Sequence, residues 1–467
     1  MTIGTLNFSM LDPMMRFIKK STFSSFLLFF SAAMALILSN SPANNYVQWF
    51  LNQSIGFTFG GFALEKSLLL WINDGLMSIF FFVVGLELKR EILAGELSVP
   101  RNVLMPIVGA VGGMLIPALI YLAFNYGGSA EVIRGWGIPM ATDIAFALGV
   151  LYLLGPRVPI QLKVFLTALA IMDDLGAVLI VAIFYTSEIS LLNLTIGGII
   201  LGLMFTLNKL GVRRVLIFAI LGIGGVWLAT LLSGVHATVA AVLAAFAIPA
   251  DRKINKTNYL NNIKQLAAKF KTANKAEQEM YLLSSEEENI IGEIKRISKA
   301  SISPLQRLER NMHGLVVYLV MPIFALANAG VVIDSNWLQM IGSPVAMGVS
   351  FGLLFGKIIG IYGLCILGLK LGWYEMPDGF NKSMILGVSC LAAIGFTMSL
   401  FITALAFENP VYIEQAKMGI LMASMVSGLM GYLILKRATS HKNRFFSSSK
   451  NVVATEGGEE VLEKQNA

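Results

Sequence analysis

The chain has 467 residues, of which 56 % are hydrophobic and 13 % are charged. Soluble proteins have about 25 % charged residues, so a soluble fold of this length would lack the polar side chains to cover its surface. We therefore expect an all-α membrane protein that crosses the bilayer many times. The formal net charge of +7 then reflects membrane topology, and nucleic-acid binding is not expected.

Twelve apolar runs have roughly the 20 residues that a helix needs to cross a bilayer. The first is expected to remain as an anchor rather than to be cleaved as a signal peptide, because its small residues Ala33 to Ala35 lie in mid-run. The predicted spans are residues 22–39, 67–88, 103–124, 137–155, 162–186, 190–208, 214–232, 234–249, 314–333, 343–369, 384–406 and 416–435.

Basic residues predict the orientation of the spans, because short cytoplasmic loops are enriched in Lys and Arg. Most basic residues fall in inner loops if both termini are cytoplasmic. The chain then divides into spans one to eight at residues 1–250, a charged cytoplasmic insertion at 251–313, spans nine to twelve at 314–436, and a disordered cytoplasmic tail at 437–467.

Two segments between spans predict structure of their own. The first outer loop alternates apolar residues around Gly60-Gly61, from Phe57 to Leu64, which predicts a β-hairpin. The insertion contains helix formers such as Leu266 to Phe270, so we expect helices there. They would form either a solvated linker or a regulatory or partner-binding element. Both cysteines, Cys365 and Cys390, lie in apolar runs and predict no disulfide framework and no zinc site.

The fifth run is interrupted only by Asp173-Asp174. Asp173 follows Val164 by nine residues, or roughly 14 Å along a helix, which places the pair near the bilayer midplane. An ionisable group there costs about 2.5–3.5 kcal/mol on insertion scales and indicates function. Neighbouring helical side chains point about 100° apart, so one aspartate could line a water-filled path while the other meets a counter-charge.

Lys357, in the tenth run, is the candidate counter-charge for this pair. A buried Asp–Lys pair could also serve only to hold two helices together, although such pairs rarely improve stability over apolar residues. Thr142-Asp143 in the fourth run and Gly395 to Thr397 in the eleventh are compatible with interrupted helices. Asp143 could then offset positive helix N-termini, and Lys357 negative C-termini.

Three further titratable residues lie at the ends of runs. Asp74 and Glu87 bracket the second run. Asp74 is either a solvated helix end or the outer mouth of a path, and Glu87 could simply sit at the membrane interface. His236 begins the eighth run and is either a hydrogen-bonded packing residue or a proton sensor.

Short motifs in these runs resemble the NhaA family of Na⁺/H⁺ antiporters over about residues 67–250 and 304–435. The motifs are W-I-N-D-G-L-M at 71–77, V-G-L-E-L-K-R-E at 84–91, A-T-D-I-A-F-A-L at 141–148, A-L-A-I-M-D-D-L-G-A at 168–177, S-G-V-H-A-T-V-A at 233–240, F-A-L-A-N-A-G at 324–330, F-G-K at 355–357 and G-F-T-M-S at 395–399.

The resemblance implies a fold and a function. It implies twelve transmembrane helices, with spans three to five and ten to twelve as inverted repeats and with spans four and eleven broken and crossing. It implies a secondary active transporter, not an enzyme, in the inner membrane of a bacterium. Cytoplasmic Na⁺, and also Li⁺, would be exchanged for external H⁺ without a cofactor, electrogenically and under pH control, in support of pH homeostasis and salt tolerance. The hairpin near Phe57 to Leu64 would join a homodimer.

The resemblance also implies roles for the midplane residues. By position, Asp173 and Asp174 match the family's ion- and proton-binding pair, and Thr142 is a candidate ion contact. Asp143 and Lys357 would balance helix-end charge, and Lys357 could also carry a proton in partnership with Asp173.

Five more residues match functional positions of the family. Asp74 resembles its outer-funnel carboxylate, whereas Glu87, His236, Glu309 and His313 match positions tied to pH response or the cytoplasmic funnel.

Two features depart from the family pattern beside the expected pH-sensing mouth. The insertion at about 253–300 is longer than the loop expected there, and Arg310 stands where a family member carries His. The set point of pH control is therefore open, whereas the exchange residues match.

Two other classes of protein would also use membrane carboxylates. An intramembrane aspartyl protease places its aspartates on separate helices, typically one within G-x-G-D, but here the pair is contiguous and that motif is absent. A cation channel, or a proton-coupled transporter of another solute, stays open as an alternative. A channel would conduct without obligatory coupling, which separates it from an exchanger by experiment.

Overall fold

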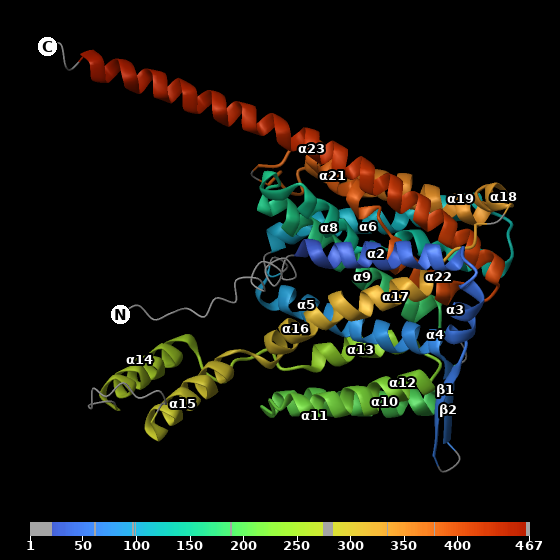
Figure 1. Ribbon diagram of the computed structural model, residues 1–467, viewed down its shortest axis with the longest axis horizontal. Coiled ribbons are helices and arrows are strands. Elements are labelled where there is room, and N and C mark those ends of the chain that lie inside the picture. Colours follow the sequence, from blue (N-terminus) through green and yellow to red (C-terminus); the bar gives the residue numbers. More distant parts are fainter. Residues whose placement is uncertain are drawn as a thin grey trace. The chain divides into compact units, whose positions relative to one another are not determined.

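The computed structural model describes residues 21–59, 62–95, 98, 100–186, 189–273, 284–333, 335–377 and 379–463. Within these residues the chain is mostly helical, and its single sheet is the antiparallel hairpin of β1 (Ser54–Phe59) and β2 (Phe62–Ser67) (Figure 1). The hairpin predicted at Phe57 to Leu64 is thus confirmed, with Phe57 paired to Leu64; its Gly60-Gly61 turn lies outside the described residues.

Helices cover the twelve predicted apolar runs. Nine helices in the described part of the chain are long and apolar enough to cross a membrane, or up to eleven if each of two bent pairs is one span. One bent pair is α21 (Lys382–Ala392) with α22 (Phe396–Ala406), which meet at 43° in the predicted eleventh span. The eighth run contains α13 (Ala237–Ala247), a shorter apolar helix. The chain is therefore a polytopic helical membrane protein.

The described helices divide between two compact units. Unit 1 consists of residues 1–77, 94–186 and 317–467. Besides the hairpin and the α21–α22 pair, it contains α2 (Ser21–Ser39), α3 (Asn44–Leu51), α4 (Leu68–Trp71), η1 (Ile72–Leu76), α6 (Pro100–Phe124), α7 (Ala130–Arg134), η3 (Gly135–Met140), α8 (Ile144–Leu153), η4 (Gly155–Arg157), α9 (Ile160–Phe184), α17 (Met321–Asn328), α18 (Trp337–Ile341), α19 (Pro344–Phe351), η7 (Gly352–Gly356), α20 (Lys357–Lys370) and α23 (Pro410–Glu463).

Unit 2 consists of residues 78–93 and 187–316. Its core joins side chains of several helices, among them Leu86, Met204, Phe218 and Val226. Besides α13, it contains α5 (Met77–Ala94), α10 (Leu191–Lys209), α11 (Val215–Ala219), η5 (Ile220–Trp227), α12 (Leu228–Leu232), α14 (Lys256–Ala273), α15 (Ser285–Ser301) and α16 (Pro304–Leu315); η6 (Val316–Val320) follows where the chain re-enters unit 1.

In unit 1, glycines let helices α6 and α20 pack backbone to backbone. A Cβ added at either Gly112 or Gly360 would overlap the carbonyl group of the other residue. One turn earlier, a Cβ at Gly356 would lie 2.6 Å from Cα of Pro117 on α6. These close approaches, at Gly356 and Gly360, lie on either side of Lys357 and hold this stretch of the helix against α6.

The described residues of the insertion at 251–313 are mostly helical, as predicted; residues 274–283 lie outside the described part. Helix α15 starts with a capping box in which Ser284 and Glu287 bond each other's backbone amides. Tyr259 of α14 and Ser298 of α15 form a hydrogen bond of 3.3 Å. For the tail at 437–467 we expect disorder, and the structure differs, since α23 continues to Glu463. Extending an established helix by one residue is easier than starting one, and the last four residues lie outside the described part.

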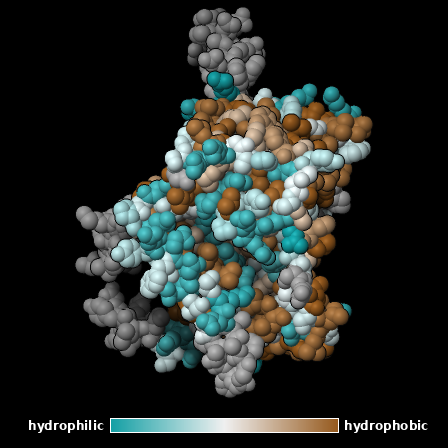
Figure 2. Space-filling view, turned by 90° about the vertical axis from the view of Figure 1, so that its right-hand side faces the viewer, coloured by the Kyte–Doolittle hydropathy of each residue, from teal (hydrophilic) through white to brown (hydrophobic). Residues whose placement is uncertain are grey.

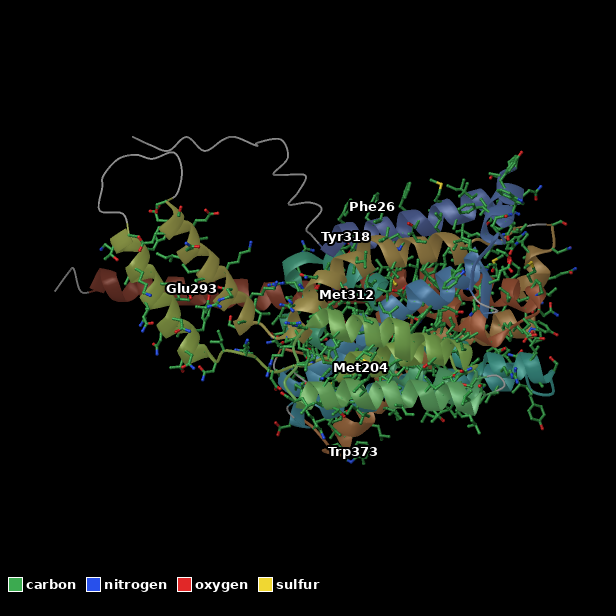
Figure 3. All side chains as sticks on the ribbon, turned by 90° about the horizontal axis from the view of Figure 1, so that it is seen from below. Phe26, Met204, Glu293, Met312, Tyr318 and Trp373 are labelled. Carbon is green, nitrogen blue, oxygen red and sulfur yellow. The ribbon has the colours of Figure 1, made fainter. Side chains whose placement is uncertain are left out.

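The apolar surface fits a membrane environment. Large hydrophobic side chains point outward from positions within helices, including Phe26 of α2 at 62 % exposure and Ile199 of α10 at 67 %. Figure 3 labels Phe26 on α2 and Tyr318 on η6, and the Tyr318 ring packs against Phe23 of α2 with ring centroids 6.2 Å apart. On the end face drawn in Figure 2, hydrophilic residues gather across the centre and hydrophobic residues lie at the margins. This distribution is expected where helix ends meet water and helix sides meet lipid.

Candidate functional site

Two interrupted helices meet in unit 1. The fourth span changes from η3 to α8 through three non-helical residues, 141–143, and the eleventh breaks between α21 and α22. The two breaks are joined directly, because the Asp143 amide donates to the Ile394 carbonyl at 2.7 Å. The Ser399 hydroxyl donates to the Ile138 carbonyl at 2.8 Å. The predicted interruptions in spans four and eleven are therefore present and hydrogen-bonded to each other; we call the place where they meet the crossing.

Asp143 caps two helix N-termini at once. One carboxylate oxygen accepts from the Phe146 amide of α8 at 3.0 Å. The other accepts from the Thr397 amide of α22 at 3.0 Å and from the Thr397 hydroxyl at 2.5 Å. The residue is 1 % exposed. A helix N-terminus carries a partial positive charge of roughly half a unit, so two of them offset one buried carboxylate.

Lys357 forms a buried ion pair with Asp173. Its Nζ lies 2.5 Å from Asp173 Oδ2, and both side chains are 0 % exposed. The ammonium group also donates to the Thr142 hydroxyl oxygen at 2.6 Å. That oxygen lies 2.7 Å from Asp173 Oδ2 and 2.8 Å from the Ala392 carbonyl at the end of α21, and its one hydrogen can serve only one of them at a time. Lys357 thus reaches a helix C-terminus through Thr142.

The aspartate pair lies mid-way along α9 and is buried. Asp173 and Asp174 are 1 % and 2 % exposed. Asp173 Oδ1 makes no hydrogen bond within the described residues. A Cβ at Gly113 would lie 3.8 Å from this oxygen, so the glycine leaves space beside it. Among the described residues, no cluster of three or more His, Cys, Asp or Glu side chains could hold a metal ion.

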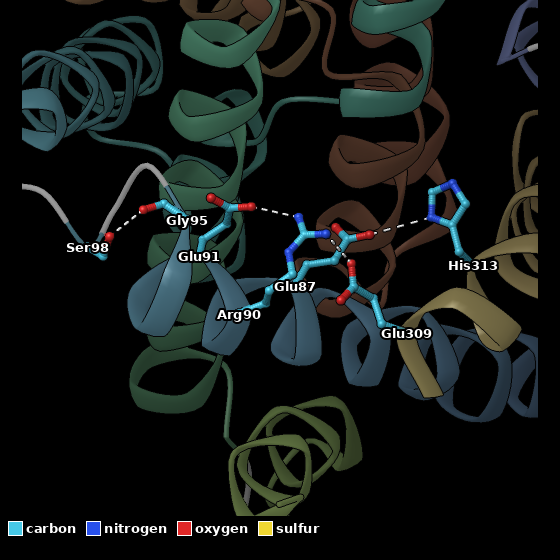
Figure 4. Close-up of polar contacts among 7 residues, drawn as sticks. All are labelled: Glu87, Arg90, Glu91, Gly95, Ser98, Glu309 and His313. Atoms are coloured by element: carbon cyan, nitrogen blue, oxygen red, sulfur yellow. Dashed lines mark hydrogen bonds and ion pairs between the residues drawn. The ribbon is translucent and has the colours of Figure 1, made fainter. Parts of the chain in front are cut away.

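A second polar cluster, in unit 2, contains three of the predicted pH-response residues (Figure 4). His313 Nδ1 lies 3.5 Å from Glu87 Oε1. Arg90 lies 2.7 Å from Glu309 and 2.6 Å from Glu91. The cluster thus joins five titratable side chains of α5 and α16, in which Glu87 is the group that contacts His313 and Arg90 links Glu309 to Glu91; the His313 side chain is 61 % exposed. Such a cluster changes its charge when protons bind.

The remaining two predicted residues lie apart from these clusters in the chain. Asp74, in η1, forms an ion pair with Lys66 of β2 at 2.6 Å, with side chains 19 % and 25 % exposed. His236 precedes α13 as its N-terminal flanking residue and makes no side-chain cap there. Asp74 therefore has an ion-pair partner in the structure.

Several interacting residues were not predicted as part of the site. Thr397 was identified only as part of a helix break, but it binds Asp143 directly. Arg90 belongs to the motif at 84–91 and had no role of its own in the prediction. Its spacing of three residues from Glu87 on one helix is the signal that could have placed it on the same face. No sequence signal marked Lys66 as the partner of Asp74, because the folding of the hairpin is what brings the two residues together.

Comparison with known proteins agrees with this geometry. The model of the family described as Na⁺/H⁺ antiporter 1 matches residues 15–435. The chain belongs to this family. A Na⁺/H⁺ antiporter NhaA of Oleidesulfovibrio alaskensis is 47 % identical over 429 residues, covering 91 % of this chain and 94 % of the relative. A Na⁺/H⁺ antiporter NhaA 1 of Saccharophagus degradans is 44 % identical over 443 residues, or 94 % of each chain. The counterpart in Wolinella succinogenes is 46 % identical over 422 residues, covering 90 % and 92 %.

Family membership confirms the resemblance seen in the sequence. The antiporter exchanges Na⁺ and H⁺ across a membrane, as the family does. Its relatives are transporters rather than enzymes. Both cysteines are buried free thiols, which matches the expectation that they act as small apolar residues.

Proposed function

We propose that Asp173 and Asp174 form the site at which Na⁺ and H⁺ compete. Support comes from two buried carboxylates at the middle of α9, beside the crossing of two broken helices. Carboxylate and hydroxyl oxygens are the ligands that a hard cation prefers, and Thr142 supplies the hydroxyl. The buried Asp173–Lys357–Thr142 contact is the single observation that carries this proposal.

Exchange follows from competition at this site. Na⁺ from the cytoplasm binds as protons leave, the site is presented to the other side, and external protons displace the ion. Because Lys357 occupies Asp173 Oδ2, an ion that approaches Asp173 either binds Oδ1 or displaces the ammonium group. Asp143 and Lys357 balance the charges of the helix ends at the crossing. No cofactor takes part, and Li⁺ follows the same route as Na⁺.

The antiporter is also proposed to be electrogenic and regulated by pH. The cluster of Glu87, Glu309 and His313 supports a pH response, because His titrates near neutral pH. We extend this role to His236, and we assign Asp74 to the outer funnel. These assignments rest on the positions matched to the family.

The topology is part of the proposal. It comprises twelve spans, with spans three to five and ten to twelve as inverted repeats, in the inner membrane of a bacterium with both termini cytoplasmic. The insertion at 251–313 is then cytoplasmic. Two copies associate through the hairpin at Phe57 to Leu64, as the lone strand pair among the described residues supports.

Reconstituted protein in sealed vesicles tests the site. With an imposed pH gradient, addition of Na⁺ to the parent protein is expected to dissipate the gradient. Asp174→Asn removes the charge while keeping the shape, and it should abolish this response. Lys417→Ala, which alters an ion pair with Glu414 on α23 of the same unit and touches none of the residues assigned to transport, serves as the control. Na⁺-driven proton movement at the parent rate in Asp174→Asn would remove the assignment, and current without proton coupling would favour a channel.

A further inference from the structure

The half-helix that leads into Thr142 and Asp143 lacks a continuous helical connection to α8. It consists of α7 and η3, residues 130–140, and the three residues after it are non-helical. Main-chain hydrogen bonds of a continuous helix therefore do not hold this half-helix in place relative to α8. Contacts with neighbouring helices must do so, because the position of the half-helix sets that of the Thr142 hydroxyl.

Two tyrosines make such contacts through their hydroxyl groups. Tyr121 of α6 donates to the Val132 carbonyl at 2.7 Å. Tyr185, which follows α9, donates to the Arg134 carbonyl at 2.5 Å and accepts from the Gly137 amide at 3.3 Å. Both tyrosines are buried, at 0 % and 9 % exposure. The main chain of the half-helix is thus held from two sides.

Glycines make room for both phenol groups. A Cβ at Gly137 would lie 2.6 Å from the Tyr185 oxygen, and one at Gly135 would overlap the Tyr121 oxygen. The two hydroxyls therefore approach the backbone where the half-helix carries no side chain. This complementarity involves a glycine and a tyrosine at each of two separate points.

The two tyrosines come from the helices that carry or support the charged residues of the site. Tyr185 ends the helix that contains Asp173. Tyr121 belongs to α6, which packs backbone to backbone against α20 through Gly112 and Gly360, and α20 begins with Lys357. The half-helix with Thr142 is thus tied to the supports of both of its partners.

We propose that Tyr121 and Tyr185 are positioning residues for Na⁺ binding, which hold residues 130–140 so that the Thr142 hydroxyl meets Asp173 and Lys357. This inference rests on the proposed function of the aspartate site. Neither tyrosine touches the ion. Loss of either hydroxyl lets the half-helix shift, so Na⁺ binding weakens while the charged groups themselves stay intact.

The test uses Tyr121→Phe and Tyr185→Phe in reconstituted protein. Each keeps the ring and removes one hydrogen bond, so we expect the apparent KM for Na⁺ to rise about two- to tenfold, with little change in maximal rate. Tyr374→Phe is a matched control, because Tyr374 is also buried and donates to a main-chain carbonyl, that of Cys365, at 3.0 Å. It should leave the KM unchanged.

A second measurement keeps the test informative if a variant transports poorly. Na⁺ raises the thermal midpoint of a protein that binds it, so the Na⁺ concentration that gives half of this rise reports binding in purified protein. It should increase by the same factor as the KM. Parental values in both tyrosine variants, or an equal increase in Tyr374→Phe, would overturn the positioning role.

Failure of this inference is distinguishable from failure of the aspartate site. If Asp174→Asn still exchanges Na⁺ for H⁺, the site itself is wrong, whatever the tyrosine variants do. If Asp174→Asn is inactive and both tyrosine variants keep the parental KM, only the positioning role is refuted.

Discussion

Replacing Lys357 by Ala should destabilise the protein strongly. The ammonium group lies 2.5 Å from Asp173 Oδ2 and 2.6 Å from the Thr142 oxygen, and no part of either charged side chain is exposed. Its removal leaves a carboxylate buried without its counter-charge and also leaves a cavity. Breaking a buried ion pair by removing one partner costs about 3–5 kcal/mol.

The same structure predicts that a second substitution restores much of this loss. In Lys357→Ala/Asp173→Asn the uncompensated charge is gone, and replacing both members of a buried pair is often neutral or stabilising. The losses of the two single variants should therefore not add. The partly solvated counterpart is Lys66→Ala, whose pair with Asp74 at 2.6 Å is 25 % and 19 % exposed. It should cost at most about 1 kcal/mol.

Denaturant unfolding of purified protein in detergent measures these differences. The parent, the two single variants, the double variant and Lys66→Ala complete a double-mutant cycle with its control. A Lys357→Ala protein as stable as Lys66→Ala would refute the reasoning. So would a double variant whose loss equals the sum of the single losses, because the two groups would then be energetically independent.

Further substitutions test the helix crossing and the helix packing by the same unfolding measurement. Gly360→Ala places a methyl group against the Gly112 carbonyl and should lower the free energy of unfolding by about 1–3 kcal/mol. Gly363→Ala is the control, because its methyl group meets nothing within 4 Å, and it should be neutral or stabilising. Equal effects of the two substitutions would refute the close packing. Asp143→Ala removes the caps of two helices and should lower the free energy of unfolding by about 2–4 kcal/mol. Ser343 caps α19 alone, so Ser343→Ala should lower it by only about 1 kcal/mol. Equal losses in the two variants would contradict the double cap.

The spans and the hairpin were predictable because each depends on local sequence. Apolar length alone locates a membrane helix, and the run at 162–186 corresponds to α9 at Ile160–Phe184. Likewise, alternation around two glycines predicted the hairpin, in which the structure pairs Phe57 with Leu64. The Asp173–Lys357 pair was also predictable, because two opposite charges in apolar runs have few alternative partners.

The arrangement at the crossing was only partly predictable, because it depends on helices distant in the chain. Sequence pattern indicated that Asp143 serves helix N-termini, but it did not indicate that one carboxylate serves both α8 and α22. The tyrosine contacts gave no signal at all. A buried Tyr is compatible with any apolar helix, and its acceptor is a main-chain carbonyl that no residue type marks.

The charges of the crossing can be summed from the structure. In the described part of unit 1, the buried charged side chains are Asp143, Asp173, Asp174 and Lys357, whose ionised forms add to 1 − 3 = −2. The two positive and two negative helix ends at the breaks cancel, at about half a charge each. Two protons would balance the remaining charge, whereas one Na⁺ would leave −1. Exchange of two protons for one Na⁺ at a site of this charge would move one net charge per cycle, as the proposed electrogenic transport requires.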